Sequence, residues 1–482
     1  MCGENNLQNI KQEMELSTTI YKKGPERLPI LIIKAYIFLL PFRMISPLLF
    51  TKQYLGVCAN YFDLVLHLLG LLLIFIRSRG VIHIYKDKTS TLFHYFAWMI
   101  AWFNLSSFIM AFIMQNKHGN IGKDSAFHGI AGMLVYFTQY AFMVFYNKEI
   151  FKEISKEEII SILNKVINIL LFIGYFQFII INFGGIFATI YDNLDIFDIM
   201  HNSNMSKICL TTTEGASAGT LIASFVYPFY MSRIFVEKRK FKYLISLLAW
   251  LPIVYLTYSS NAYILIAIDV LVFSLIYIFK VRSNMKPMII CLLFSIAMIF
   301  GLTFSTVITN IVPDEVSANI QYLMFEKAID KANGSTVSRT VPFYVNWGAF
   351  TEYPVFGVGN GNQGYFYEKY FPHYAYNVAG SDVRVFLERS RNEISNGGVF
   401  IPSLLSGYGI VGAILVLMYI IKCMYHANEN RDNLGSFYYM FYISWAAIFV
   451  SGFQGDFTGE YYIWFLLSIP YIAASINQTN TQ

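Results

Sequence analysis

The hydrophobic pattern of the chain consists of long apolar blocks separated by shorter polar stretches. Twelve blocks can be delimited, and most are close to the roughly 20 apolar residues that a helix needs to cross a hydrocarbon core. A segment that crosses a membrane must satisfy its backbone hydrogen bonds internally, so each block is predicted to be a helix. The pattern therefore predicts an all-α, polytopic membrane protein of about 12 transmembrane helices. The blocks cover residues 28–50, 54–76, 91–113, 126–145, 159–183, 216–232, 243–258, 262–279, 287–308, 399–421, 437–453 and 460–476.

The composition agrees with a membrane protein and excludes an ordinary soluble domain. Hydrophobic residues make up 56% of the chain and charged residues 13%. A soluble domain carries about 25% charged residues, so half of that cannot coat a water-facing surface. The five cysteines are scattered without a CxxC pair or a metal-ligand spacing, so no metal site is predicted.

Charge fixes the orientation of the predicted helices. Lysine and arginine gather before the first block and after the second, fourth, sixth, eighth and tenth blocks, as in Arg233–Lys242. The short loops on the opposite side hold only Lys52, Lys117, Lys123 and Lys207. By the positive-inside rule, both chain ends are predicted to be cytoplasmic. The predicted parts are a tail at 1–27, membrane helices at 28–308, a large extracytoplasmic loop at 309–397, further membrane helices at 398–476, and a tail at 477–482.

The large loop is polar but rich in tyrosine, phenylalanine, glycine and asparagine. Disordered linkers are poor in aromatic residues, and long loops in compact proteins are usually functional. We therefore expect this loop to be partly helical and to pack back over the membrane helices.

Two parts of the loop offer candidate chemistry. Glycines at 357, 359 and 361 follow Pro354 and suit either a phosphate cradle or a plain tight turn. The tight turn is the preferred interpretation. Arg384, Arg389 and Arg391 lie among acidic residues and suit either a diphosphate site or a salt-bridged surface.

Outside the loop, Glu214 precedes the sixth block within the stretch Leu210–Gly219. A glutamate there is either a helix cap or, in an outward-facing cavity, a general base or a ligand of sugar hydroxyls. Lys34 and Asp269 lie inside apolar blocks, where charges are costly and mark candidate functional positions. For Asp269, a structural ion pair is an equal alternative.

Three stretches together resemble the bacterial O-antigen and capsular polysaccharide repeat-unit polymerases of the Wzy type. Leu210–Gly219 resembles that family's Thr-x-Glu element, although Gly215 stands where proline is common. Ser338–Gly361 resembles its long-loop signature, and Asn396–Gly412 resembles the entry to the next helix. The chain departs from the family at Thr257–Asn261, which lacks an arginine that is often found there.

The resemblance implies a GT-C-like, metal-independent membrane glycosyltransferase that needs no cofactor. Such an enzyme transfers a growing glycan from undecaprenyl diphosphate to the next lipid-linked repeat unit, at the outer face of the bacterial cytoplasmic membrane. Its expected partners are the undecaprenyl-diphosphate-linked oligosaccharide, membrane lipid, and a chain-length regulator and flippase of the same pathway, with no nucleic acid. The expected catalytic residues are Glu214, Arg339 and His373, and the expected substrate-binding residues are Arg384, Arg389, Arg391, Ser217, Trp347 and Asn396.

Three other functions fit the same sequence. An O-antigen ligase uses the same donor but a different acceptor. A lipid-linked oligosaccharide flippase or another transporter would show short outer loops and matched internal halves, whereas this chain has a long loop and no visible repeat. A non-catalytic membrane receptor or assembly partner would leave the arginines replaceable.

Overall fold

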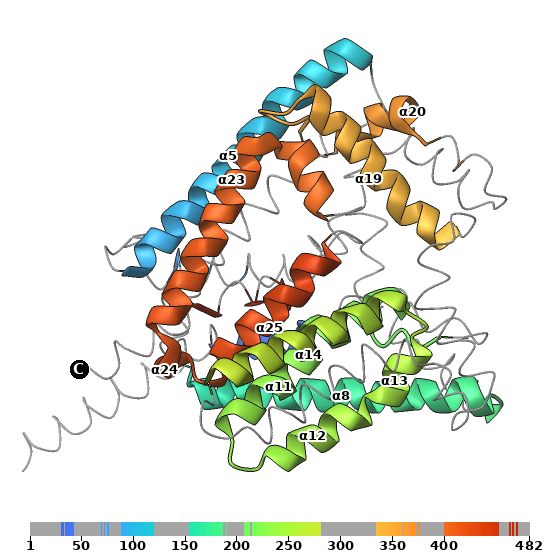
Figure 1. The fold of residues 1–482 in the computed structure, drawn as a ribbon, viewed down its shortest axis with the longest axis vertical. Helices are drawn as coiled ribbons and strands as arrows, with labels where there is room; N and C mark the ends of the chain where they lie inside the picture. The colour runs from blue at the N-terminus through green and yellow to red at the C-terminus, as the bar shows by residue number, and fades with distance from the viewer. Residues whose placement is uncertain are drawn as a thin grey trace, which may run out of the picture.

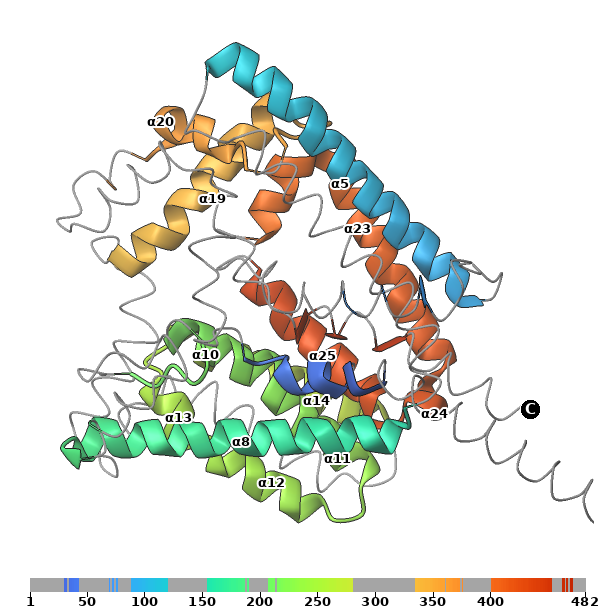
Figure 2. The ribbon, with the colours of Figure 1, turned by 180° about the vertical axis from the view of Figure 1, so that it is seen from behind.

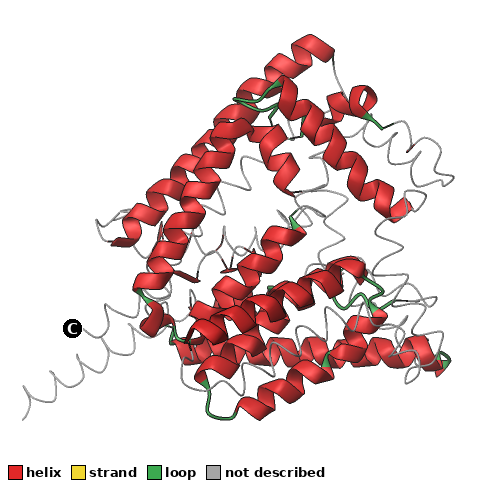
Figure 3. Cartoon of the chain, viewed as in Figure 1, coloured by secondary structure: helices red, strands yellow, loops and turns green. Residues whose placement is uncertain are grey.

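The computed structural model describes residues 30–32, 34–42, 88–119, 154–186, 207–212, 215–280, 334–359, 361–372 and 400–452, with isolated positions at 69–76, 189, 375 and 462–470. Every regular element within these residues is a helix, and none is a strand (Figure 3). The predicted all-α class is thus confirmed for this part of the chain.

Five helical stretches are long and apolar enough to cross a membrane. Each coincides with a predicted block, and together they support a membrane-embedded protein. The predicted total of about 12 spans, and the side on which the termini lie, stay predictions. The stretches are His94–His118 within α5 (Lys88–His118), α8 (Lys156–Phe183), the continuous α10 (Gly215–Leu221), η4 (Ile222–Val226) and α11 (Tyr227–Val236), Ser260–Ile278 within α14 (Ser260–Lys280), and α23 (Phe400–Glu429).

The predicted helix at 243–258 is interrupted. It forms α12 (Lys240–Ala249) and α13 (Leu251–Leu256), which meet at the fully buried Trp250. Pro252 lies in the first turn of α13, where the N–H group that proline lacks is not needed. In the interior of one continuous helix, the same proline would remove a backbone hydrogen bond.

The helices form two groups (Figures 1 and 2). In one group α5 packs along α23, and α19 (Gly334–Glu352) packs against α23. In the other group α11 contacts α12, α8 contacts α13, and α10 contacts α14. The shorter helix α25 (Ser436–Ser451) contacts α11 and α14. A large apolar core runs through both groups and includes Phe96, Phe225 and Phe441.

Part of the predicted large loop is helical and has a small apolar core of its own. We call residues 334–372 the loop module; it contains α19, η6 (Gln363–Phe366) and α20 (Tyr367–Tyr370). Its buried residues Val345 and Phe366 cluster with Met110 and Met114 of α5. The module therefore packs onto the end of a candidate membrane helix, as the sequence led us to expect.

The charges inside apolar blocks have different environments. Lys34 forms an ion pair of 2.5 Å with Glu158, at the start of α8. Asp269 of α14 is completely buried, and neither carboxylate oxygen has a hydrogen-bond partner among the residues that the structure describes. The alternative of a structural ion pair at Asp269 therefore finds no partner in that part of the chain.

Candidate functional site

The segment that leads to Glu214 is held in place by one buried amide. The Gln177 side chain, from the C-terminal third of α8, donates to the Leu210 carbonyl at 2.9 Å and accepts from the Cys209 and Leu210 N–H groups. The Thr211 hydroxyl also donates to the Pro41 carbonyl at 2.5 Å. Leu210 has a positive φ of 51°, which is unfavourable for a leucine. These hydrogen bonds give the segment a defined path.

The segment then packs very closely against the start of α14. A Cβ atom on Gly215 would overlap the Thr257 carbonyl oxygen, and one on Gly219 would lie 2.6 Å from the Ala262 Cβ. Small residues are therefore required where α10 crosses α14. We call this arrangement of residues 207–212, 215–221 and 257–262 the helix-start junction, and it brings two stretches that are distant in the sequence into contact.

The helix-start junction continues into a π-helix. The Asn261 amide donates to the Thr220 hydroxyl at 3.1 Å, and the Ser224 hydroxyl donates to the Thr220 carbonyl at 2.5 Å. The π-helix η4 covers Ile222–Val226, directly after α10. Single π-helical turns within α-helices occur often at functional sites, because they change the direction of the side chains that follow.

In the loop module, the glycine-rich stretch binds a kink in α23. The Val358 N–H group donates to the Ser406 carbonyl at 2.7 Å, and the Gly359 N–H group donates to the Gly407 carbonyl at 2.9 Å. Gly409 has a φ of 66° within α23, and a Cβ atom there would overlap the Val355 carbonyl group. We call this contact the glycine clasp.

The glycine clasp decides between the two interpretations of the glycine run. The N–H groups of Gly357, Val358 and Gly359 all donate to carbonyls of the protein, so they are not available to a phosphate. The glycines instead allow a turn and a close approach of two backbones. The tight-turn interpretation is favoured for these positions.

A buried polar network lies under the glycine clasp. The Ser406 hydroxyl donates to the Asn346 amide oxygen at 2.5 Å and accepts from the Gln363 amide at 3.3 Å. The Asn346 amide also donates to the Pro342 carbonyl at 2.7 Å. The network joins α19, η6 and α23, because each of these elements contributes one side chain.

The outer face of α19 carries exposed aromatic side chains. Trp347 is 53% exposed, and Phe343 and Tyr344 are exposed one turn earlier. The Trp347 and Phe350 rings lie 5.6 Å apart. Trp347 is thus placed where a sugar ring could stack on it, and position 339 lies two turns before it in the same helix.

Polar contacts fix the far end of the loop module. Lys369 forms an ion pair of 2.8 Å with Glu352, and the Tyr370 hydroxyl donates to the same carboxylate at 2.7 Å. Partial burial alone would raise the pKa of Glu352, but the hydrogen bonds from Lys369 and Tyr370 outweigh it, so the pKa of this carboxyl lies below its usual value. Lys117 at the end of α5 donates to the Tyr353 hydroxyl at 2.7 Å.

The predicted site residues are only partly covered by the structure. Ser217 is half-buried in α10, and Trp347 is exposed on α19. Arg339 occupies a position in α19, but its side chain lies outside the described part. In both ribbon views α10 and α19 belong to different helix groups (Figures 1 and 2). The predicted residues that lie outside the described residues are Glu214, His373, Arg384, Arg389, Arg391 and Asn396.

Several structurally important polar residues were not singled out by the sequence. Gln177, Asn346 and Ser406 are all buried and bind segments distant in the chain. Gln177 could have been identified from the sequence, because a polar amide inside an apolar block needs a hydrogen-bond partner.

No family model matches the sequence, and no curated protein matches it either.

Proposed function

We propose that the chain is a membrane glycosyltransferase that polymerises lipid-linked glycan repeat units, as its motifs imply by their resemblance to the Wzy-type polymerases. It would act at the outer face of a bacterial cytoplasmic membrane. The donor would be a glycan on undecaprenyl diphosphate, and the acceptor would be a second lipid-linked repeat unit.

One observation carries the proposal: two of the three motif stretches behind the resemblance are packing partners. Val358 and Gly359, from the long-loop signature, bond to Ser406 and Gly407, at the entry to the following helix. Loops that carry function are positioned by rigid scaffolds, and here the clasp attaches the loop module to α23, while an apolar cluster attaches it to α5. This supports reading these two motifs as parts of one unit.

The proposed reaction needs charge stabilisation more than bond activation. The acceptor hydroxyl oxygen attacks the anomeric carbon of the donor sugar, and the bond from that carbon to the diphosphate oxygen breaks. The diphosphate leaves with the bonding electrons, and arginine forks neutralise its growing charge. We assign this role to Arg339 with one or more of Arg384, Arg389 and Arg391.

The acceptor hydroxyl also has to lose a proton as it attacks. A carboxylate at Glu214 or an imidazole at His373 suits this task. The helix-start junction would position Glu214, and the aromatic face around Trp347 would hold sugar rings.

Deletion of the gene in its host, followed by sizing of the surface glycan, tests the function. A polymerase predicts surface material with a single repeat unit. Long glycan chains that stay on the lipid carrier would indicate a ligase instead. Lipid-linked units that accumulate on the cytoplasmic side would indicate a flippase and exclude the proposal.

Point variants in the complemented deletion strain test the site. Arg339→Ala and Arg384→Ala are each expected to abolish polymer while the amount of protein in the membrane stays normal. Lys165→Ala, a change of an exposed cation on α8 outside the proposed site, is the control and should leave polymer unchanged. Normal polymer in both arginine variants would refute the diphosphate assignment.

A further inference from the structure

The turn between α11 and α12, together with the first residues of α12, concentrates positive charge without carboxylate partners among the residues that the structure describes. Lys238, Arg239, Lys240 and Lys242 occupy four of five consecutive positions. The nearby Glu237 is already paired with Arg233 at 2.6 Å. None of these four cations has an ion-pair partner within the residues that the structure describes.

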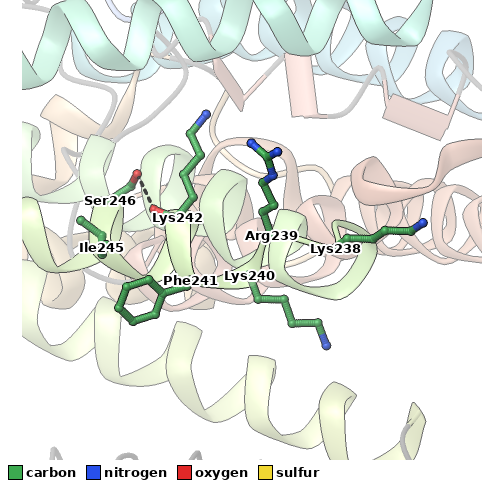
Figure 4. Close-up of a pocket in the computed structure, with 7 residues that line it drawn as sticks. All are labelled: Lys238, Arg239, Lys240, Phe241, Lys242, Ile245 and Ser246. Carbon is green, nitrogen blue, oxygen red and sulfur yellow. Dashed lines mark hydrogen bonds between the residues drawn. The ribbon is translucent and has the colours of Figure 1, made fainter.

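The four side chains are not equivalent. Arg239 and Lys242 point to the same side of the turn, whereas Lys238 and Lys240 point in other directions (Figure 4). Both lysines of α12 also lie over tyrosine rings, Lys240 at 6.0 Å from the centre of Tyr277 and Lys242 at 5.9 Å from that of Tyr243, so the difference between them is one of direction. Arg239 and Lys242 are therefore the pair that a single anionic group can engage.

The same place is apolar as well as basic. A hollow of about 660 Å³ is lined by the four cations together with Phe241, Ile245 and Ser246 (Figure 4). Phe241 is 72% exposed and Ile245 is 50% exposed. Leu244 and Leu248 are also exposed further along α12. A free phosphate gains nothing from the apolar part of this surface, whereas the acyl chains of a lipid do.

We propose that this turn binds the headgroup of an anionic phospholipid. Arg239 and Lys242 hold the phosphate, and an acyl chain lies along the exposed side chain of Ile245, about one turn beyond Lys242 on α12. Guanidinium groups match phosphate geometry, and basic residues beside an apolar helix face are typical of recognition of anionic lipid. The inference is independent of the proposed glycosyltransferase activity.

Binding of phosphatidylglycerol to the purified full-length protein tests the proposal, with native mass spectrometry as the measurement. Two double variants each remove two positive charges: Arg239→Gln with Lys242→Gln, and Lys238→Gln with Lys240→Gln. The first is expected to weaken binding roughly thirtyfold, since each cation near an anionic lipid contributes about fivefold. The second, the matched control, is expected to weaken it no more than about threefold, because its side chains point elsewhere.

Equal losses in the two variants would overturn the proposal, because they would indicate general attraction to a basic surface. A second test uses the unaltered protein, so its outcome does not depend on whether the variants fold. Phosphatidylglycerol should displace phosphatidylcholine, and inorganic phosphate at the same concentration should not displace phosphatidylglycerol. Equal binding of the two lipids, or displacement by inorganic phosphate, would also overturn it.

Discussion

The Ser406 hydroxyl of α23 donates a 2.5 Å hydrogen bond to the Asn346 amide oxygen of α19 and so connects the loop module to a membrane helix. Both side chains are completely buried. Removal of one partner leaves the other unsatisfied away from water, which costs about 1–3 kcal/mol.

Ser406→Ala is therefore expected to lower the free energy of unfolding by about that amount. Thermal unfolding of the purified variant should show a lower Tm. Limited proteolysis should cleave it more readily within residues 334–372. Ser403→Ala is the matched control, since the buried Ser403 hydroxyl has no hydrogen-bond partner in the part of the chain that the structure describes. The interpretation fails if the two variants have the same Tm.

A second prediction concerns the glycine clasp. Gly409→Ala places a Cβ atom against the Val355 carbonyl group. It also forces a residue with a side chain to keep a positive φ. Gly119→Ala has a similar φ of 78° but open space around the new atom. Only the cost of the φ angle, about 1–2 kcal/mol, applies at Gly119.

Gly409→Ala should consequently lower the Tm more than Gly119→Ala, and hydrogen exchange should increase in residues 353–359 only in the former. Similar stabilities of the two variants would mean that the backbone contact contributes nothing to the attachment of the module.

A third prediction tests how the segment before Glu214 is positioned. Gln177→Leu removes three hydrogen bonds to Cys209 and Leu210 while it keeps a side chain of similar size. The loss of these hydrogen bonds should destabilise the position of the segment by about 1–3 kcal/mol. If Glu214 acts as proposed, polymer formation should then fall by roughly tenfold or more. Gel analysis of glycan length in the complemented deletion strain measures this.

Asn182→Leu serves as its comparison, because Asn182 is an exposed residue on the same helix and bonds only within it. Glycan length in that variant should equal that of the unaltered protein. A normal glycan with Gln177→Leu would remove the support for a positioning role.

A fourth prediction concerns Asp269. Its side chain is completely buried and has no hydrogen-bond partner among the residues that the structure describes, and such a carboxyl group destabilises the fold. Asp269→Leu should raise the free energy of unfolding by about 1–3 kcal/mol, whereas Asp269→Glu, which keeps the carboxyl group, should bring no gain. A lower Tm with leucine would indicate that a group binds to this carboxylate in the native protein.

The sequence was sufficient for the elements whose signal is local. Helices such as α8 and α14 follow from long, mainly apolar runs, whose backbone can be satisfied only within a helix. The break at Trp250 could have been inferred from Pro252, but the apolar run through it favoured a single helix. The packing of the loop module was expected in general terms from its aromatic content.

Contacts between distant residues could not be predicted in the same way. Nothing in the local pattern around Ser406 indicates that Asn346 accepts its hydrogen bond, because the pairing depends on how α19 crosses α23. The glycines of 353–361 suited two kinds of site, and only the partners of their N–H groups distinguish them. The roles of Glu214, Arg339 and the other arginines stay predictions, since they depend on side chains outside the described residues.

The glycine clasp also sets an order of events during synthesis. The loop module contacts α5, which leaves the ribosome earlier, and α23, which leaves it later. Domains of a growing chain fold from the N-terminal side. The module can therefore bury Met110 and Met114 while the chain is still being made, but the Val358 and Gly359 N–H groups reach their carbonyl partners only once Ser406 and Gly407 have been synthesised. Completion of the module thus depends on the later synthesis of α23.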